Sequence, residues 1–289
     1  MDPPSAEDTP CISCLNRRSK TIKAFYHGHL NDPFWEPIVA AANRAGDEQG
    51  VTLETKLYDS IDNSAQMAAD IRRAVQRRQE EPVDALILSI PSELVRDAAW
   101  EATTVGIPVF GMNCGWENEY DTTLEMGGWV GQDDYKAGKL AAERFLQAQP
   151  TINKAIFVNH EAETRGMQKR FKGFQEGILA SNPTASVIEV KVDVSTPFAK
   201  FNMERELKAY LETCDADVVM SGGAWPARPA MEAVQKWDVD CNKVQPTFFA
   251  TFDATQDIVA SIASGDILFA VSQQSHLQAS VPVTLASVY

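Results

Sequence analysis

The sequence has 289 residues, of which 44% are hydrophobic and 23% are charged, a balance that argues against a disordered chain and allows two folded domains of ordinary size. Its formal net charge of -14 argues against a nucleic-acid partner, because binding phosphates requires a basic surface. No apolar run reaches the roughly 20 residues that cross a bilayer, so we expect no direct membrane insertion.

The first half of the chain alternates short apolar runs with amphipathic stretches of helical length, which is typical of parallel strands joined by crossover helices. The predicted strands lie at residues 21–27, 51–58, 83–89 and 107–112. The helices between them are a segment from Phe34 that Gly50 ends, a segment from an Asn63 cap to about Glu80, and residues 91–105 followed by Gly106.

The second half repeats this pattern after Gly131-Gln132-Asp133-Asp134. A helix is predicted up to Gln149. The strands that follow are predicted at 153–160, 186–192, 217–221, 247–252 and 268–272, and the helices at 165–181, 197–214, 226–237 and 254–264. No Ser-, Gly- or Pro-rich linker separates the halves, so we expect them to be closely joined. The predicted fold class is α/β, with parallel sheets.

The five cysteines do not form a metal-site pattern. Cys11 and Cys14 form a Cys-x-x-Cys motif without the second pair that zinc requires. We expect residues 1–20 to be a flexible leader that holds a small disulfide loop or two free thiols, with any export signal absent or removed. Three cysteines stand alone in the sequence and are predicted to pack as small apolar side chains: Cys114, Cys214 and Cys241.

Motifs of nucleotide and acyl-transfer enzymes are missing from the sequence. No Gly-x-Gly-x-x-Gly follows the first predicted strand, and neither Gly-x-x-x-x-Gly-Lys-Ser/Thr nor Gly-x-Ser-x-Gly occurs. No nucleophile, base and orienting group can be argued together, so we predict no catalytic residues, no cofactor and no metal. The alternative is a nucleotide- or sugar-processing α/β enzyme, which a turnover screen against labelled sugars would reveal.

Six segments carry a further pattern in their order and spacing. The first is Asn31-Asp32-Pro33-Phe34-Trp35, which opens a helix after the first strand. The others are residues 83–91, 106–111, 130–142, 170–174 and 249–257. Together they resemble the periplasmic binding protein type I family, in its ribose-, galactose- and autoinducer-binding branch, over residues 21–289.

The resemblance implies two similar, doubly wound parallel-sheet lobes joined by a hinge, with a monosaccharide-like ligand in the cleft between them. The first lobe would comprise residues 21–132 and 276–289, and the second residues 133–275. Binding would close the hinge, and the protein would not be an enzyme. It would act as a solute-binding protein or as the sensor domain of a receptor.

The resemblance also implies ligand-binding residues on both lobes. Those of the first lobe would be Asp32, Phe34, Trp35 and Asn113, and those of the second lobe or hinge Arg170, Phe198, Asp253 and Gln273. A sugar offers apolar C–H faces and a rim of hydroxyls, which aromatic planes and charged or amide groups match.

Each candidate also has an ordinary structural alternative. The aromatic residues can pack in the core, Arg170 can lie on a helix surface, Asp253 can cap a helix, and Asn113 and Gln273 can be turn and loop residues. We expect a cleft-facing Trp35, whose change to alanine weakens binding more than folding. We also expect the opposite charges of Arg170 and Asp253 to hold each other in place.

Two departures from the family pattern bear on the ligand. Gly222 and Gly223 stand where relatives carry a polar ligand-binding residue, and Trp225 could replace that contact by stacking or be an ordinary buried tryptophan. The chain also stops at Tyr289 within a predicted returning helix, which implies a trimmed protein or a further segment. The resemblance implies an extracytoplasmic location, periplasmic or extracellular, and a membrane permease or a receptor signalling domain as the protein partner.

Overall fold

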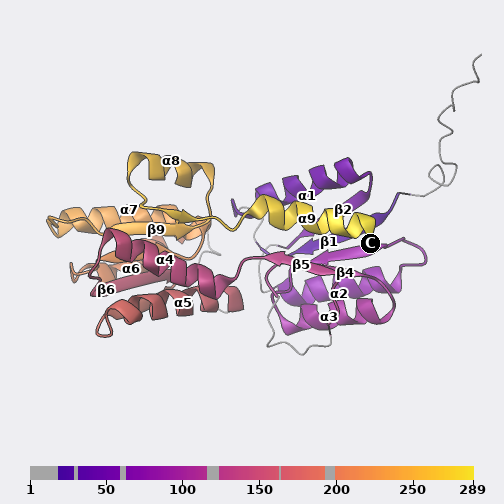
Figure 1. Ribbon diagram of the computed structural model, residues 1–289, viewed down its shortest axis with the longest axis horizontal. Helices are drawn as coiled ribbons and strands as arrows, with labels where there is room; N and C mark the ends of the chain where they lie inside the picture. Colours follow the sequence, from indigo (N-terminus) through magenta and orange to yellow (C-terminus); the bar gives the residue numbers. More distant parts are fainter. Residues whose placement is uncertain (1–18, 29–31, 59–62, 116–123, 163, 193–198) are drawn as a thin grey trace, which may run out of the picture.

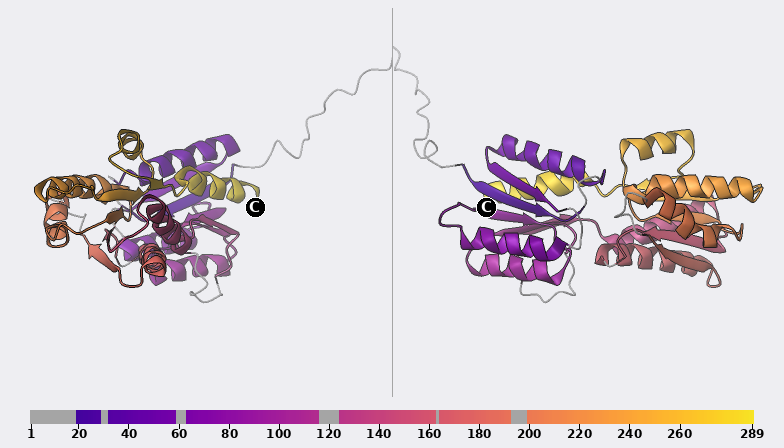
Figure 2. Two further views of the ribbon diagram at one scale, coloured as in Figure 1. Left: turned by 60° about the vertical axis from the view of Figure 1, so that its left-hand side comes forward. Right: turned by 180° about the vertical axis from the view of Figure 1, so that it is seen from behind.

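The arrangement of strands follows the alternation predicted from the sequence. The computed structural model describes residues 19–28, 32–58, 63–115, 124–162, 164–192 and 199–289. These residues form two five-stranded parallel sheets, each covered by helices on both faces, which lie side by side along the long axis of the molecule (Figures 1 and 2). The predicted α/β fold class with two parallel sheets is therefore confirmed.

The first sheet has the strand order β2-β1-β3-β4-β5. Its strands are β1 (Thr21–Tyr26), β2 (Thr52–Leu57), β3 (Ala85–Leu88), β4 (Val109–Asn113) and β5 (Gly128–Gly131). The helices around it are α1 (Trp35–Gln49), α2 (Ser64–Gln76), α3 (Glu93–Thr104) and α9 (Ser275–Val288). Alternation along β1 sends Ile22 and Ala24 into the core under α1 and α9, and Phe25 into the core under α2 and α3.

The second sheet has the strand order β10-β9-β8-β6-β7. Its strands are β6 (Lys154–Asn159), β7 (Ser186–Lys191), β8 (Val218–Ser221), β9 (Phe248–Phe252) and β10 (Ala270–Val271). Its helices are α4 (Asp134–Ala148), α5 (Arg165–Ser181), α6 (Ala199–Leu211), α7 (Ala224–Asp240) and α8 (Gln256–Ser264). Helices α4 and α5 cover one face and α6 and α7 the other, so the strands are buried on both sides.

The chain passes between the two sheets twice in the described residues. It leaves the first sheet where β5 ends at Gly131 and enters the second at the start of α4. It returns between the end of β10 at Val271 and the start of α9, which packs beside α1 on the first sheet (Figure 1). Two short segments therefore connect the halves.

Apart from shifts of a few residues at the ends of other elements, three details differ from the sequence prediction. Strand β5 is not among the predicted strands, because two of the four residues in its Gly-Trp-Val-Gly run are glycines. It forms a strand because it pairs with β4. The second helix ends at Gln76 rather than near Glu80. Asn63 stands at its N-cap position, but its side chain makes no capping hydrogen bond.

The prediction for two of the cysteines is wrong. Cys214, just beyond α6, and Cys241, at the end of α7, form a disulfide with their Cα atoms 5.6 Å apart. The two helices pack side by side, which brings together residues 27 positions apart in the sequence. Cys114 is the one free cysteine of the described residues, whereas Cys11 and Cys14 lie outside them.

The closest helix contact in the second half is between α4 and α5. A Cβ atom on Gly138 would lie 2.1 Å from the carbonyl oxygen of Arg170, and one on Gly173 would lie 2.0 Å from that of Tyr135. Only glycine permits this approach, because neither neighbour is a movable side-chain tip. The contact sets the position of Arg170 against the start of α4.

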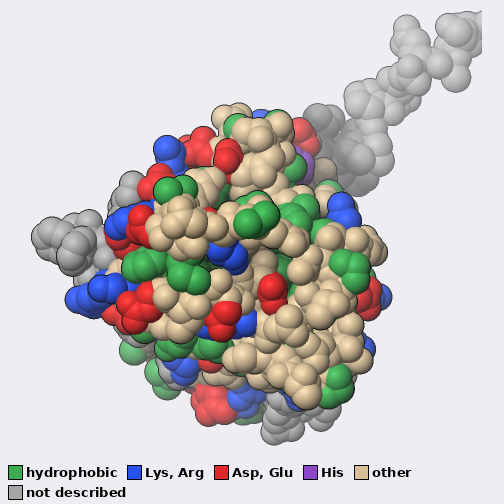
Figure 3. Space-filling view, turned by 90° about the vertical axis from the view of Figure 1, so that its left-hand side faces the viewer, with side chains coloured by type: hydrophobic (Ala, Val, Ile, Leu, Met, Phe, Trp, Pro, Cys, Tyr) green, Lys and Arg blue, Asp and Glu red, His purple; other side chains and the backbone are tan. Residues whose placement is uncertain are grey.

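The surface agrees with the composition. None of the described helices is both long and apolar enough to cross a membrane. Figure 3 views the end of the molecule farthest from the first sheet, where the described acidic and basic side chains are interspersed. The net negative charge is therefore not countered at this end by a separate basic face of the kind that phosphate binding needs.

We predict that Gly138→Ala lowers the free energy of unfolding by about 1 to 3 kcal/mol, because the new methyl group forces α4 and α5 apart. Denaturant titration measures this loss. Leu140→Ala, at a half-exposed position on the same helix, should change stability by no more than about 0.5 kcal/mol. Equal effects of the two changes would show that the helix contact tolerates the methyl group.

We also predict that loss of the Cys214–Cys241 disulfide costs about 2 to 4 kcal/mol, because the bond restricts the unfolded chain. Cys214→Ser, Cys241→Ser and the double change should have the same effect, since each removes the same bond. Reduction with dithiothreitol should destabilise the original chain but not the double variant. A double variant as stable as the original chain contradicts the prediction.

Candidate functional site

A cavity lies where the carboxyl ends of the strands of both sheets face each other, the usual ligand position in doubly wound sheets. Its volume is about 540 Å³, including the solvent at its mouth. The first half of the chain contributes His27, Asp32, Phe34, Trp35, Asn113 and Cys114. The second half contributes Asp134, His160, Glu161, Thr164, Gly166, Met167, Arg170, Gly223, Asp253 and Gln273.

All but one of the predicted site residues line this single cavity. The structure brings together Asp32, Phe34, Trp35, Asn113, Arg170, Asp253 and Gln273. Phe198 lies outside the described residues. Trp225 does not line this cavity and packs, partly buried, against the core of the second half. It also lines a neighbouring pocket together with Phe34, Asp253 and Gln273, so both of its predicted roles, stacking and ordinary packing, stay predictions.

Arg170 lies at the centre of the polar contacts and is 8% exposed. Its Nε donates to Asp134 Oδ1 at 2.7 Å, its Nη1 to the carbonyl oxygen of Gly222 at 2.9 Å, and its Nη2 to Gln273 Oε1 at 2.7 Å. The guanidinium also lies 4.6 Å from the centre of the Phe252 ring. Arg170 is thus a buried cavity residue rather than a surface residue of its helix.

We expect Asp253 and Arg170 to pair directly, but the structure shows no direct hydrogen bond between them. Gln273 stands between them, with its amide nitrogen donating to Asp253 Oδ1 at 2.6 Å while its oxygen accepts from Arg170. The other Asp253 oxygen accepts the backbone N–H of Ala224 at 2.9 Å, so this carboxylate caps α7. Asp253 therefore does cap a helix, as its structural alternative implied. The capped helix is α7, whereas α8, the next helix after Asp253, is capped by Thr255.

Gln278 extends the polar network into the first half. Its Nε2 donates to the carbonyl oxygen of Gln273 at 2.7 Å, and its Oε1 accepts from Asn113 Nδ2 at 3.1 Å. Asn113 has a φ of 61°, so it also shapes the turn after β4, as its alternative role implied. No sequence pattern predicts this role of Gln278, because a single glutamine in an apolar helix belongs to no motif.

The two glycines that depart from the family pattern have a packing reason. The Gly222 carbonyl serves Arg170, and a Cβ on Gly222 would lie 2.2 Å from Met167 Cε. A Cβ on Gly223 would lie 2.6 Å from His160 Cε1. Side chains from α5 and from the end of β6 therefore occupy the space that a polar side chain would fill.

Trp35 is more deeply packed than predicted. It is 2% exposed and contacts the rings of Tyr26, His27 and Phe34 within the first core, while it also lines the cavity. This burial argues against the expected separation of binding from folding at Trp35, because removing a ring this buried leaves a core cavity that costs roughly 3 to 5 kcal/mol.

The carboxyl groups of the cavity have perturbed pKa values. Burial raises the pKa of Asp32 to about 7, against the lowering effect of the Phe34 N–H, and the charges of Asp253 and Glu161 raise it further. Burial also raises the pKa of Glu161 to about 7, against the effect of Arg170. Burial likewise raises the pKa of Asp253. These acids hold protons more readily than exposed ones.

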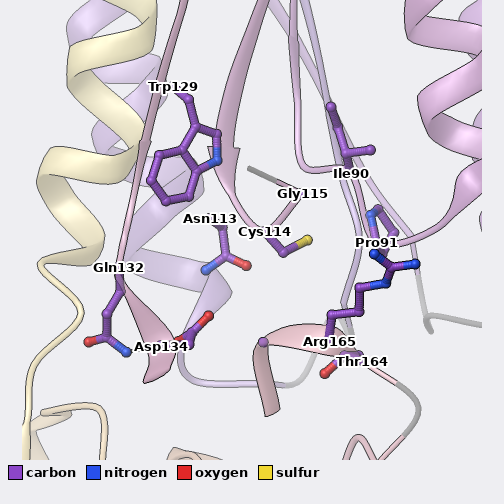
Figure 4. Close-up of a pocket in the computed structure, with 11 residues that line it drawn as sticks. Ile90, Pro91, Asn113, Cys114, Gly115, Trp129, Gln132, Asp134, Thr164 and Arg165 are labelled. Carbon is purple, nitrogen blue, oxygen red and sulfur yellow. Dashed lines mark hydrogen bonds between the residues drawn. The ribbon is translucent and has the colours of Figure 1, made fainter. Parts of the chain in front are cut away.

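A smaller cavity adjoins the first and shares Asn113, Cys114 and Asp134 with it (Figure 4). Arg165 also lines it and extends toward Pro91. Cys114 lies with its sulfur 3.6 Å from Nδ1 of His27, and burial lowers the pKa of that histidine to about 4. The described residues include no group of His, Cys, Asp and Glu side chains that could hold a metal ion.

The family model of the periplasmic binding protein domain matches residues 24–289. A carbohydrate transporter from Acidothermus cellulolyticus 11B, solved with myo-inositol, is 24% identical with a TM-score of 0.80, covering 94% of this chain and 87% of that one. The Caulobacter myo-inositol binding protein, bound to myo-inositol, is 20% identical with a TM-score of 0.77, covering 94% and 88%.

The XylFII–LytSN complex contains a chain that is 19% identical with a TM-score of 0.74, covering 94% of this chain and 93% of that one. At these identities the likeness of the solved structures shows the fold alone. A sequence comparison with curated proteins finds no match.

We predict that Asp32→Asn stabilises the ligand-free protein at about pH 8, raising Tm by about 2 to 5 °C. Because the pKa of Asp32 is higher in the folded than in the unfolded chain, its neutral form stabilises the fold. This contribution is complete below about pH 4 and is lost as the pH rises through about 7. The difference should therefore vanish near pH 4. Asp97→Asn, on the exposed face of α3, serves as control. An unchanged difference across this range contradicts the prediction.

Proposed function

The chain belongs to the periplasmic binding protein domain family, and from this premise we propose that it binds a monosaccharide-like small molecule in the cavity between its two sheets. The proposal rests on the lining of this cavity. The rings of Phe34 and Trp35 from the first half, here called the aromatic wall, line it together with the hydrogen-bonded Arg170, Gln273 and Asp253 of the second half. The family is one of non-catalytic solute-binding proteins, which agrees with the prediction that the chain is not an enzyme.

The cavity matches the two surfaces of a sugar or cyclitol. Phe34 and Trp35 offer ring surface to the C–H face of such a ligand. Arg170 has five N–H donors, of which three reach protein oxygens and one, on Nη1, faces the sulfur of Met167, so the second N–H of Nη2 remains for a ligand hydroxyl. Asp32 and Asn113 supply further polar groups from the opposite side.

We propose that binding closes the molecule about the two connecting segments. The lobes would be residues 21–132 with 276–289, and residues 133–275, as the family resemblance implies. Gln273 follows β10 in the second connection and bonds to both sides of it, to Arg170 and through its backbone to Gln278. A ligand that contacts this network would be sensed where the lobes join.

An extracytoplasmic location, periplasmic or extracellular, is part of the proposal. The family is typically extracytoplasmic, and the Cys214–Cys241 disulfide supports this, because such bonds persist mainly in oxidising compartments. The protein partner would be a membrane permease or a receptor signalling domain. The structure of XylFII with LytSN supports the second possibility as an example on the same fold.

A thermal-shift panel of pentoses, hexoses, cyclitols and their amino derivatives tests the proposal. A ligand at a hundred times its Kd should raise the free energy of unfolding by about 2.7 kcal/mol. Gln273→Ala should weaken binding of that ligand by about tenfold or more, because it removes the link between Arg170 and Asp253. Gln245→Ala, at an exposed position, should leave the affinity unchanged. No shift with any member of the panel would refute the proposal.

A further inference from the structure

The cavity contains more acidic than basic side chains. Its acidic residues are Asp32, Asp134, Glu161 and Asp253, and its one arginine is Arg170. The other titratable groups that face it are His27, Cys114 and His160. Burial keeps His27 uncharged near neutral pH by lowering its pKa to about 4, and burial raises the pKa of Cys114, which keeps its thiol protonated.

The single arginine is already engaged by the protein. Arg170 forms an ion pair with Asp134 at 2.7 Å, and it donates two further hydrogen bonds to Gly222 and Gln273. Asp253 is likewise held by Gln273 and by the N-terminus of α7. Arg165, in the adjoining cavity, extends toward Pro91 (Figure 4). Neither Asp32 nor Glu161 forms an ion pair with a described residue, although the charge of Arg170 lowers the pKa of Glu161.

Asp32 and Glu161 have oxygens available to a ligand. Asp32 is 7% exposed, and only its Oδ1 is used, as acceptor of the Phe34 N–H at 2.9 Å. Its other oxygen accepts no hydrogen bond from the described residues. The carboxyl group of Glu161 accepts none from them either, although the residue is only partly exposed and lines the cavity. These oxygens are not fully buried, so they remain accessible to a ligand in the cavity.

The two residues lie on opposite sides of the cavity. Asp32 precedes α1 on the first sheet, and Glu161 follows β6 on the second. The charge of Glu161 raises the pKa of Asp32, though less than burial and the charge of Asp253 do. A single ligand group that supplies several donors and a positive charge would satisfy both carboxylates at once, as the three N–H donors of an ammonium group can.

We propose that the ligand is an amine-bearing polyol, such as an amino sugar or an aminocyclitol, whose ammonium group is bound by Asp32 and Glu161. This assignment rests on the proposed function, because it names the class of ligand for the same cavity. The hydroxyls of the ligand would face Arg170 and Asn113, and its apolar face would lie on the aromatic wall. A neutral polyol would leave the two carboxylates to repel each other or to take up protons.

The pKa values give the proposal a pH signature. The carboxyl groups of Asp32 and Glu161 both have pKa values of about 7, so they are largely neutral at about pH 5.5 and mostly ionised at about pH 7.5. The affinity for an ammonium group should therefore increase over this interval. The affinity for a neutral polyol should not show the same increase.

Titration calorimetry with matched probes tests the assignment. Each series has an amine, its parent hydroxyl compound and the N-acetyl amide: glucosamine, glucose and N-acetylglucosamine, with the galactose and scyllo-inositol series in parallel. At about pH 7.5 the amine of at least one series should bind about tenfold to a hundredfold more tightly than its parent. At about pH 5.5 this preference should be lost.

Variants locate the preference. Asp32→Asn with Glu161→Gln keeps the shape of both side chains and should abolish the preference for the amine while the parent compound still binds. Glu48→Gln with Glu143→Gln removes the same charge from exposed positions, one on each half, and should preserve the preference. The pH comparison uses the unaltered protein, so it tests the proposal even if the cavity variant is unstable.

Three outcomes overturn the inference. If a parent hydroxyl compound binds and its amine binds no better, the ligand is a neutral polyol and the proposed function stands. If the preference survives in the Asp32 and Glu161 double variant, the ammonium site is elsewhere. If no compound of any series binds, both the inference and the proposed function are contradicted.

Discussion

The buried guanidinium of Arg170 is the interaction on which the site depends. A buried cation is costly unless each of its donors meets an acceptor. Here the acceptors come from the start of α4, the turn after β8 and the segment after β10, while the Phe252 ring of β9 covers the guanidinium. One side chain therefore ties four elements of the second half together at the cavity edge. Gly138 makes this possible by letting α4 approach the backbone of α5 at Arg170.

The fold follows from local sequence patterns because its strands are parallel and buried. Runs such as Ala85–Leu88 are apolar throughout, and helices such as Trp35–Gln49 carry their apolar residues at helical spacing and end at glycine. What the pattern did not predict depends on pairing or on contacts between distant segments. Strand β5 is stabilised by its neighbour β4, and the Cys214–Cys241 disulfide requires knowing that α6 and α7 end together.

The site was predictable to the extent that parallel strands place their carboxyl ends at one edge. This rule, with the family resemblance, identified residues after β1, β4, β9 and β10. It did not identify which groups bond to each other. Asp134 lies in the first turn of α4, where acidic residues are common, and Glu161 lies in a loop without a motif. The partner of Arg170 and the second unsatisfied carboxyl group depend on side-chain positions that no spacing encodes.

The cavity sets a physical requirement on whatever fills it. Asp32 on one side and Asp253 and Glu161 on the other are close enough for their charges to raise the pKa of Asp32. When these groups are ionised, their like charges oppose the approach of the two halves, and Arg170, which is paired with Asp134, offsets part of the charge of Glu161 and Asp253. Any occupant that draws the halves together must therefore supply donors to both sides. An apolar molecule of the same size cannot do so, because it would desolvate the carboxylates without bonding to them.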